Sequence, residues 1–363
     1  MSDQEEYEVV MNTAFPGRTL PHARAPSGTV SITAAGTLLD SDCEEDIDES
    51  APKSVPPMSL FHATRLSRPI TIWHFVFFLY FPFGIILMVW RGFWVIIWEL
   101  FMFDIGKWLN LSHFFFKIYA AGFLMFTSVS GLENLQKNKN GKTPRIIVAN
   151  HVSEFDVVPL KSIFGSFSTV APEYYKRLVF TRRVILELDP LYMDLGGKEE
   201  VRQRIRAHLE KTKSPLLVFP EGCLTSGDTG LMMYHKFLFE LEEPVLPVVL
   251  RVHRPMPVHV DTLCTPVWHN VLWFALCPWQ HWSVEILPVA EAKPGEDGKQ
   301  FANRVQRQTA DALGISATSF SKKDKKELVT KMTPTLRRRN RIKGMFTQLV
   351  PGRGNEVAEN VDT

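Results

Sequence analysis

The longest hydrophobic stretch lies between residues 70 and 103, where the chain reads ITIWHFVFFLYFPFGIILMVW, then one arginine, then GFWVIIWELFMF. This run exceeds the roughly 20 residues of a helix that crosses a bilayer. Pro82 and Gly84 interrupt it and leave arms of 12 and 15 residues, because proline removes a backbone donor and glycine loosens the chain. As a helix the shorter arm is about 18 Å long, against about 30 Å of hydrocarbon.

Residues 60–110 are therefore predicted to form a membrane-embedded helical hairpin with both ends on one face. A single kinked transmembrane helix is the alternative, because such helices tolerate proline. Four cationic side chains flank or divide the arms, where they can reach lipid head groups: Arg65, Arg68, Arg91 and Lys107. Many of the 26 Phe and 9 Trp of the chain lie in this stretch, which also favours contact with a membrane or a lipid-droplet monolayer.

After residue 120, short apolar runs alternate with helical patterns, as is typical of a mixed α/β domain. Strands are predicted for RIIVA (145–149), PLLVF (215–219), PVLPVVL (244–250) and WSVEILPV (282–289). Amphipathic helices are predicted over 198–211, where Val201, Ile205 and Leu209 form one stripe, and over 298–314. We expect an α/β fold with a mixed sheet flanked by helices over residues 120–295, preceded by the hairpin and bounded by disordered termini.

The two ends of the chain are polar and differ in charge. Residues 1–57 are rich in Ser, Pro, Thr and acidic side chains and are predicted to be a disordered acidic head. Residues 296–363 are predicted to hold an amphipathic helix and a basic tail, with ten Lys or Arg between positions 322 and 343. We expect this tail to contact anionic lipid and not nucleic acid, with a merely solvated tail as the alternative.

The compartment is indicated by what the sequence lacks. The four cysteines show neither CxxC spacing nor a regular disulfide framework, as expected in a reducing compartment. The apolar run begins too late in the chain for a cleavable signal peptide. Both termini are therefore expected to face the cytosol.

The strand predicted at 145–149 is followed directly by NHVSEFD (150–156), in which a histidine and an aspartate lie five positions apart. A carboxylate at this spacing can fix the tautomer of His151 and stabilise its imidazolium, which makes the imidazole a general base near neutral pH. The chain has neither a GxSxG elbow nor a metal-ligand spacing that includes His151, so the hydroxyl to be deprotonated belongs to a substrate and no metal or cofactor is expected. The alternative is that the pair is only the polar end of a buried strand.

A second polar loop, VFPEGCLTSG (218–227), follows the strand predicted at 215–219. Pro220 and Gly222 bracket Glu221 in a tight turn, and Thr225 and Ser226 come next. Backbone donors and small hydroxyls in such a loop suit an anionic or polyhydroxyl ligand.

Together, NHVSEFD and FPEG, about 70 residues apart and each at a strand end, resemble the first and third motifs of the glycerolipid acyltransferase (PlsC-like) superfamily. The resemblance implies transfer of an acyl group from acyl-CoA, a co-substrate, to glycerol 3-phosphate or a lysophospholipid. It implies that His151 is the base, Asp156 its orienting partner, and Glu221 with Gly222 part of the acceptor site. The stretch PVLPVVL, with Pro247, is similar to the fourth motif, which lines the acyl side.

The second motif of the superfamily departs from its usual form. An arginine follows a glycine-and-aromatic stretch there, whereas the corresponding LYMDLGGKEE has Leu195 and Gly196. Arg182, Arg183 or Arg202 could replace that phosphate clamp, and each is equally a candidate surface residue.

Residues from about 60 to 328 are further similar to the ancient ubiquitous protein family of endoplasmic reticulum and lipid droplets. That family carries a ubiquitin-binding CUE domain after the acyltransferase region, for which the segment ending at Thr363 is too short and too polar. Two hypotheses follow. The chain is a monotopic acyltransferase, or it is an adaptor at the reticulum and lipid droplets that keeps the fold without the activity. Intact first and third motifs favour the enzyme, and the altered second motif favours the adaptor.

Overall fold

The structure, a computed structural model, describes residues 55–135, 144–172, 175–176, 182–193 and 198–332. All of these belong to one compact unit, Ala34–Thr363. Nearly all of the predicted acidic head, most of the basic tail, and Leu195 with Gly196 lie outside the described residues.

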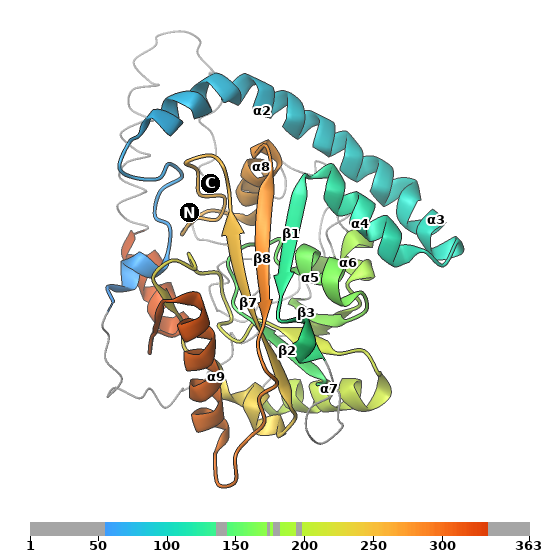
Figure 1. The fold of residues 1–363 in the computed structure, drawn as a ribbon, viewed down its shortest axis with the longest axis vertical. Helices are drawn as coiled ribbons and strands as arrows, with labels where there is room; N and C mark the ends of the chain where they lie inside the picture. Colours follow the sequence, from blue (N-terminus) through green and yellow to red (C-terminus); the bar gives the residue numbers. More distant parts are fainter. Residues whose placement is uncertain (1–54, 136–143, 173–174, 177–181, 194–197, 333–363) are drawn as a thin grey trace, which may run out of the picture. The chain divides into compact units, whose positions relative to one another are not determined.

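A seven-stranded mixed sheet forms the centre of this unit (Figure 1). Its strand order is β1-β8-β7-β2-β5-β3-β4. The strands are β1 (Met125–Ser130), β2 (Ile146–Ala149), β3 (Ser168–Pro172), β4 (Pro190–Met193), β5 (Leu216–Val218), β7 (Val245–His253) and β8 (Gln280–Ile286). Strands β7, β2, β5, β3 and β4 run parallel to one another. Strand β8 is antiparallel to β7, and β1 is parallel to β8. The four predicted strands correspond to β2, β5, β7 and β8, and the predicted mixed sheet is confirmed.

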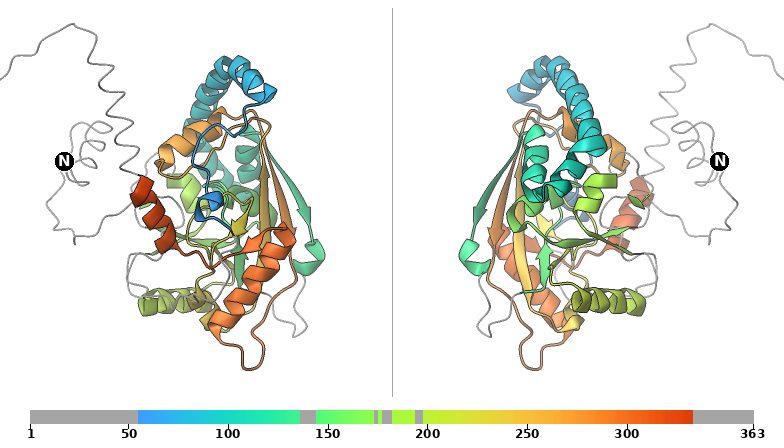
Figure 2. Two further views of the ribbon diagram at one scale, coloured as in Figure 1. Left: turned by 90° about the vertical axis from the view of Figure 1, so that its left-hand side faces the viewer. Right: turned by 90° about the vertical axis from the view of Figure 1, so that its right-hand side faces the viewer.

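Helices cover both faces of the sheet (Figures 1 and 2). They are α4 (Ser112–Gly122), α5 (Val157–Phe164), α6 (Arg182–Glu187), α7 (Lys198–Lys211), α8 (Val267–Leu276) and α9 (Gly298–Leu313), with short 3-10 helices η1 (Pro57–Leu60), η3 (Leu132–Leu135) and η6 (Lys236–Leu241). Alternate residues of β2 enter two different cores: Ile147 and Ala149 pack with α5 and α8, and Ile146 and Val148 pack with α7, α9 and η6. A small second sheet joins β6 (Gly230–Leu231) to β9 (Ser316–Ala317).

Both predicted amphipathic helices are present. In α7 the stripe of Val201, Ile205 and Leu209 is buried in the core. In α9 the side chain of Asp297 accepts a hydrogen bond from Gln300 N, and Gly314 ends the helix in the left-handed conformation at φ 72°.

The predicted break at Pro82 and Gly84 is wrong. Helix α2 (Ile72–Ile97) passes through Pro82 unbroken and continues through the π-helical turn η2 (Trp98–Met102) into α3 (Phe103–Trp108). Over Ile72–Trp108 this makes one helix of 37 residues, long and apolar enough to cross a membrane by length and composition. The chain reverses only at Asn110, whose φ is 56°, and then enters α4.

The two residues have different roles from those expected. Pro82 lies on the exposed side of α2, where it removes one intrahelical hydrogen bond and the helix continues through it. Gly84 is buried where α2 crosses α8, and a Cβ there would lie 2.9 Å from Tyr80 and 3.1 Å from Leu276. The glycine therefore allows close helix packing and does not form a turn.

Arg91 also differs from the prediction that it reaches lipid head groups. Its side chain is 1% exposed and donates hydrogen bonds to the carbonyl oxygens of Ala275, Cys277, Phe123 and Pro278. These carbonyls end α8 and α4, so one charged side chain joins the apolar helix to the α/β unit.

We expect Arg91→Met to lower the free energy of unfolding by at least about 3 kcal/mol, because it leaves several buried carbonyl oxygens without donors. Thermal unfolding in detergent measures the effect. Phe93→Leu, at an exposed position of the same helix, is the control and should change little. Equal melting temperatures for Arg91→Met and the wild type would contradict the role assigned to the arginine.

Candidate active site

The turn after β2 is fixed by side chains within it and beside it. The amide of Asn150 donates to Leu250 O at 2.9 Å, and its oxygen accepts from Leu250 N at 2.7 Å, which extends the pairing of β2 with β7. Asp156, at the start of α5, accepts hydrogen bonds from Val152 N at 2.7 Å and Ser153 N at 2.9 Å. The Asp156 carboxylate thus holds the turn together through two backbone N–H groups, and helix α5 begins at the next residue.

The predicted pair of His151 and Asp156 is brought together. His151 Nδ1 lies 3.0 Å from Asp156 Oδ2, and the side chains are 1% and 0% exposed. The ring of His151 stacks on Phe219 with centroids 4.0 Å apart. Since Nδ1 donates to the carboxylate, Nε2 is the nitrogen with a free lone pair. Nε2 is buried and has no hydrogen-bond partner among the described residues.

Glu221 lies beside this pair and contacts the backbone. Its carboxylate accepts from His151 N at 2.9 Å and from Met232 N at 3.0 Å. Burial raises the pKa of Glu221 to about 7, although these backbone N–H groups oppose the rise. Gly222 follows at φ 68°, a conformation that favours glycine. One oxygen of Glu221 thus braces the turn that carries His151, the other holds the backbone of Met232, and contact of Glu221 with an acceptor stays a prediction.

The remaining predicted residues lie close to the turn or within the sheet. Thr225 N donates to His151 O at 2.9 Å, and Ser226 N donates to Leu60 O at 2.7 Å. Pro247 is buried in β7, opposite Val148 of β2. Thr225 therefore supports the histidine directly, whereas Pro247 is part of the sheet.

The three arginines suggested as a phosphate clamp have other contacts. Arg183 forms an ion pair with Asp104 of α3, and Arg202 pairs with Glu199 and Glu240. Arg182 is exposed on α6. None of these contacts involves the turn that carries His151.

Arg254 is a cation that sequence reasoning missed. It follows β7 directly, and its Nη2 lies 3.4 Å from Ser153 Oγ and 3.5 Å from Asp261 Oδ2. The only signal in the sequence was the polar stretch RVHRP after a predicted strand, which does not by itself point to the turn.

We call residues 59–67 the strap. It bonds to the loop of the third motif, where Thr229 Oγ1 donates to Ser59 O at 2.8 Å, and to the segment after β7, where Leu263 N donates to His62 O at 2.8 Å. Arg65 of the strap donates to Asn270 Oδ1 at 2.8 Å. The strap thus bridges the two segments that contact the turn of residues 150–156 through Thr225 and Arg254.

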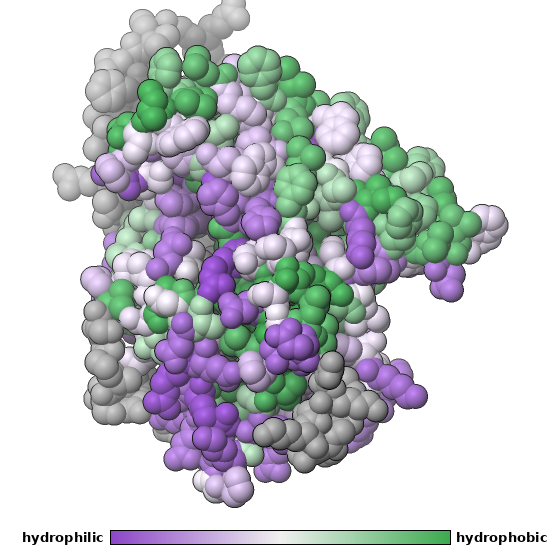
Figure 3. Space-filling model, in the orientation of Figure 1, coloured by the Kyte–Doolittle hydropathy of each residue, from purple (hydrophilic) through white to green (hydrophobic). Residues whose placement is uncertain are grey.

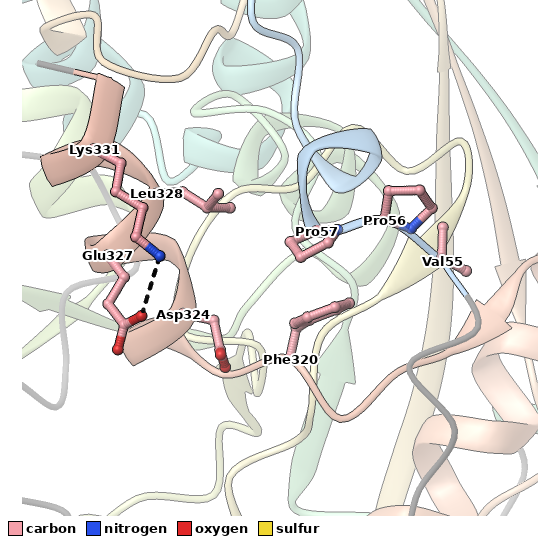
Figure 4. A pocket seen from close by; sticks show the side chains of 8 residues that line it. All are labelled: Val55, Pro56, Pro57, Phe320, Asp324, Glu327, Leu328 and Lys331. Carbon is pink, nitrogen blue, oxygen red and sulfur yellow. Dashed lines mark ion pairs between the residues drawn. The ribbon is translucent and has the colours of Figure 1, made fainter.

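The strap begins beside a cavity of about 430 Å³ that Figure 4 shows. Prolines 56 and 57 line one side, and Leu328, Asp324 and the Glu327–Lys331 ion pair come from the helical segment 322–332 opposite. Val55 and Phe320 complete the lining, and neither motif contributes a residue to it.

The chain is similar to known proteins over part of its length. Residues 127–251, from β1 through most of β7, match the family model "Acyltransferase". The chain is similar to the lipid droplet-regulating VLDL assembly factor AUP1 of Danio rerio, with 31% identity over 55% of this chain and 47% of the relative. It is similar to the AUP1 homolog of Caenorhabditis elegans, with 28% identity over 59% of this chain and 54% of the relative.

Two further similarities concern enzymes. Glycerol-3-phosphate acyltransferase 3 of Xenopus laevis is 27% identical over 51% of this chain and 43% of the relative. The solved lysophosphatidic acid acyltransferase PlsC of Thermotoga maritima aligns with 64% of this chain and 97% of its own, at 16% identity and a TM-score of 0.47.

Residues 127–251 are therefore similar to the acyltransferase family, as the first and third motifs indicated. Over somewhat more than half of its residues the chain is also similar to the lipid droplet-regulating factor AUP1. The chain spans about half the length of the AUP1 relatives that it matches.

Glu221 provides a pH test of the site. Its pKa is about 7 in the folded protein against a usual 4.5, so its ionisation weakens the fold as pH rises from about 4.5 through about 7. Glu221→Gln lacks this ionisation. We expect the stability of the variant relative to wild type to increase by about 3 kcal/mol across that window. Thermal unfolding at several pH values measures this, with exposed Glu210→Gln as the control, and parallel curves would refute it.

Proposed function

We propose that this protein is a membrane-bound acyltransferase that moves an acyl group from acyl-CoA to a hydroxyl of glycerol 3-phosphate or a lysophospholipid. The observation that carries the proposal is the unpartnered Nε2 of a histidine whose Nδ1 is held by a buried carboxylate. The acyltransferase family match and the similarity to a glycerol-3-phosphate acyltransferase support the reaction class.

The reaction would use these two side chains together. Nε2 of His151 removes the proton from the acceptor hydroxyl, and the oxygen attacks the thioester carbonyl of acyl-CoA. The Asp156 carboxylate stabilises the imidazolium that forms. Collapse of the tetrahedral intermediate breaks the carbon–sulfur bond, and the imidazolium returns its proton to the departing thiolate. The ester and free CoA result, and His151 is again neutral.

The surface of α2 supports a membrane location. Phe77, Gly84 and Arg91 of α2 and Trp98 of η2 recur every seven residues and lie on the buried face of this continuous helix. Most other large side chains of the helix are exposed and apolar, including Ile72, Phe75, Phe78, Phe83, Ile86 and Phe93, and Figure 3 shows green hydrophobic surface along α2 and α3. A helix that packs on the α/β unit along its length suits the plane of a membrane or droplet surface better than a crossing of it. Both termini would then face the cytosol at the endoplasmic reticulum and lipid droplets.

A second candidate function is an adaptor without activity. The burial of Nε2 favours it, and so do the ion pairs of Arg183 and Arg202, whose partners lie outside the turn. So does the similarity to relatives named as regulators of lipid droplets.

His151→Ala removes the proposed base, and general-base help is worth about 10² to 10⁴ in rate, so we expect acyl transfer to fall by that factor. Asp156→Asn should impair the same step by a similar or smaller factor. The double variant should lose little more than the worse single variant, because the two residues act as a unit. The assay is release of CoA by the purified protein with a panel of glycerol 3-phosphate and lysophospholipids.

The matched control is His253→Ala, at the exposed end of β7, which should keep full activity. Full activity of His151→Ala, or no transfer by the wild type with any acceptor, would favour the adaptor.

Access to His151 requires movement, and the strap is the segment we expect to move. It bridges the segments on either side of the catalytic turn and leads within a few residues into α2. Arg65→Ala removes its hydrogen bonds to Asn270 and to the carbonyls of His259 and Val260. We expect the variant to turn over several-fold faster than wild type when no lipid vesicles are present, and equally fast with vesicles. The same dependence on vesicles in both proteins would contradict this.

A further inference from the structure

The Asp156 carboxylate accepts one hydrogen bond from a donor that lies outside its own motif. Oδ2 accepts from His151 Nδ1, Val152 N and Ser153 N, all within the turn. The other oxygen, Oδ1, accepts from Nε1 of Trp282 at 3.2 Å. Trp282 lies 126 positions away in the sequence, and neither motif of the site includes it.

The sheet topology delivers this indole. Trp282 is 0% exposed in β8, where its neighbours across the ladders are Val252 of β7 and Thr127 of β1. Its side chain belongs to the core that also holds α5 and α8, and its ring lies 6.3 Å from that of Phe274. Strand β7 separates β8 from β2, so the indole reaches the turn from the second strand away.

The chemistry of the two groups makes the contact selective. The indole N–H is a donor only, and a buried tryptophan needs an acceptor for it. A buried carboxylate needs donors on both oxygens, because an unsatisfied oxygen loses its hydration without compensation. With Oδ1 held by Trp282, rotation of the carboxylate about its Cβ–Cγ bond is opposed, and Oδ2 keeps its direction toward His151.

We propose that Trp282 is a positioning residue for acyl transfer, acting through Asp156 to hold the imidazole of His151 in its working orientation. The proposal rests on the proposed function for its kinetic consequences and on the hydrogen bond between Trp282 and Asp156 for its structural ones. Removal of the indole N–H should lower kcat about tenfold to a hundredfold, as for other partners that orient a reactive ligand, and leave KM within about twofold.

The test replaces Trp282 with benzothienylalanine, which has sulfur in place of N–H and almost the same shape. Trp282→Phe is a second, genetically simpler variant. Trp94→Phe is the matched control, because Trp94 Nε1 donates at the same 3.2 Å to a backbone carbonyl, that of Tyr119. Changes at Trp282 and at Trp94 should both lower the melting temperature, whereas only the changes at Trp282 should lower kcat.

A double-variant cycle separates positioning from general support of the fold. In the Asp156→Asn background, the change at Trp282 should cost less than about twofold in kcat, because the carboxylate it orients is absent. Equal losses in both backgrounds would show that Trp282 contributes packing alone and would overturn the proposal.

A second readout does not depend on turnover. In protein labelled with 15N-histidine, the Nδ1 proton of His151 should be protected from exchange with water by its bond to Asp156. Trp282→benzothienylalanine should speed this exchange at least tenfold, and Trp94→Phe should not. An unchanged exchange rate overturns the proposal even if the wild type proves inactive, whereas inactivity with faster exchange overturns only the proposed function.

Discussion

The candidate site depends on one buried carboxylate. Asp156 is fully buried, and a buried charge is tolerated only when its oxygens are hydrogen-bonded. The donors are two backbone N–H groups of the turn, the imidazole of His151 and the indole of Trp282. Three of them come from the turn after β2 and one from β8, so the carboxylate fixes the turn, the histidine and the first residues of α5 against the sheet at once.

A second carboxylate repeats this arrangement on the other side of the histidine. Glu221 holds the backbone of His151 and of Met232, and Thr225 of the same loop donates to the carbonyl of His151. The first and third motifs are thus joined by hydrogen bonds between backbone and side chains. Each motif therefore supplies hydrogen-bond donors or acceptors to buried groups of the other.

The apolar helix α2 is part of the same folded unit. Arg91, surrounded by four carbonyl oxygens, and Gly84, which lets α2 approach α8, bind the helix to the domain through specific contacts. The strap connects the start of α2 to both segments that flank the catalytic turn. The apolar surface of α2 and the candidate site are therefore linked through the nine consecutive residues of the strap.

The sequence by itself determined the features that depend on local pattern. The four apolar runs became β2, β5, β7 and β8, the stripe of Val201, Ile205 and Leu209 became the buried face of α7, and the spacing in NHVSEFD was sufficient to pair His151 with Asp156. Strands β1, β3 and β4 were not predicted. For β1 the reason is that it is largely exposed at the edge of the sheet and its residues lack an alternating pattern.

Only the tertiary structure decided the contacts between distant segments. Proline and glycine both disfavour the interior of a helix, and on local preference Pro82 and Gly84 should interrupt α2. Packing on α8 and the hydrogen bonds of Arg91 stabilise the continuous helix by more than these two residues destabilise it. Trp282 and Arg254 could not be assigned from local pattern, because their positions beside the turn depend on the strand order that places β7 and β8 next to β2. Strand order is set by the packing of the whole sheet, and a local pattern of residues does not encode it.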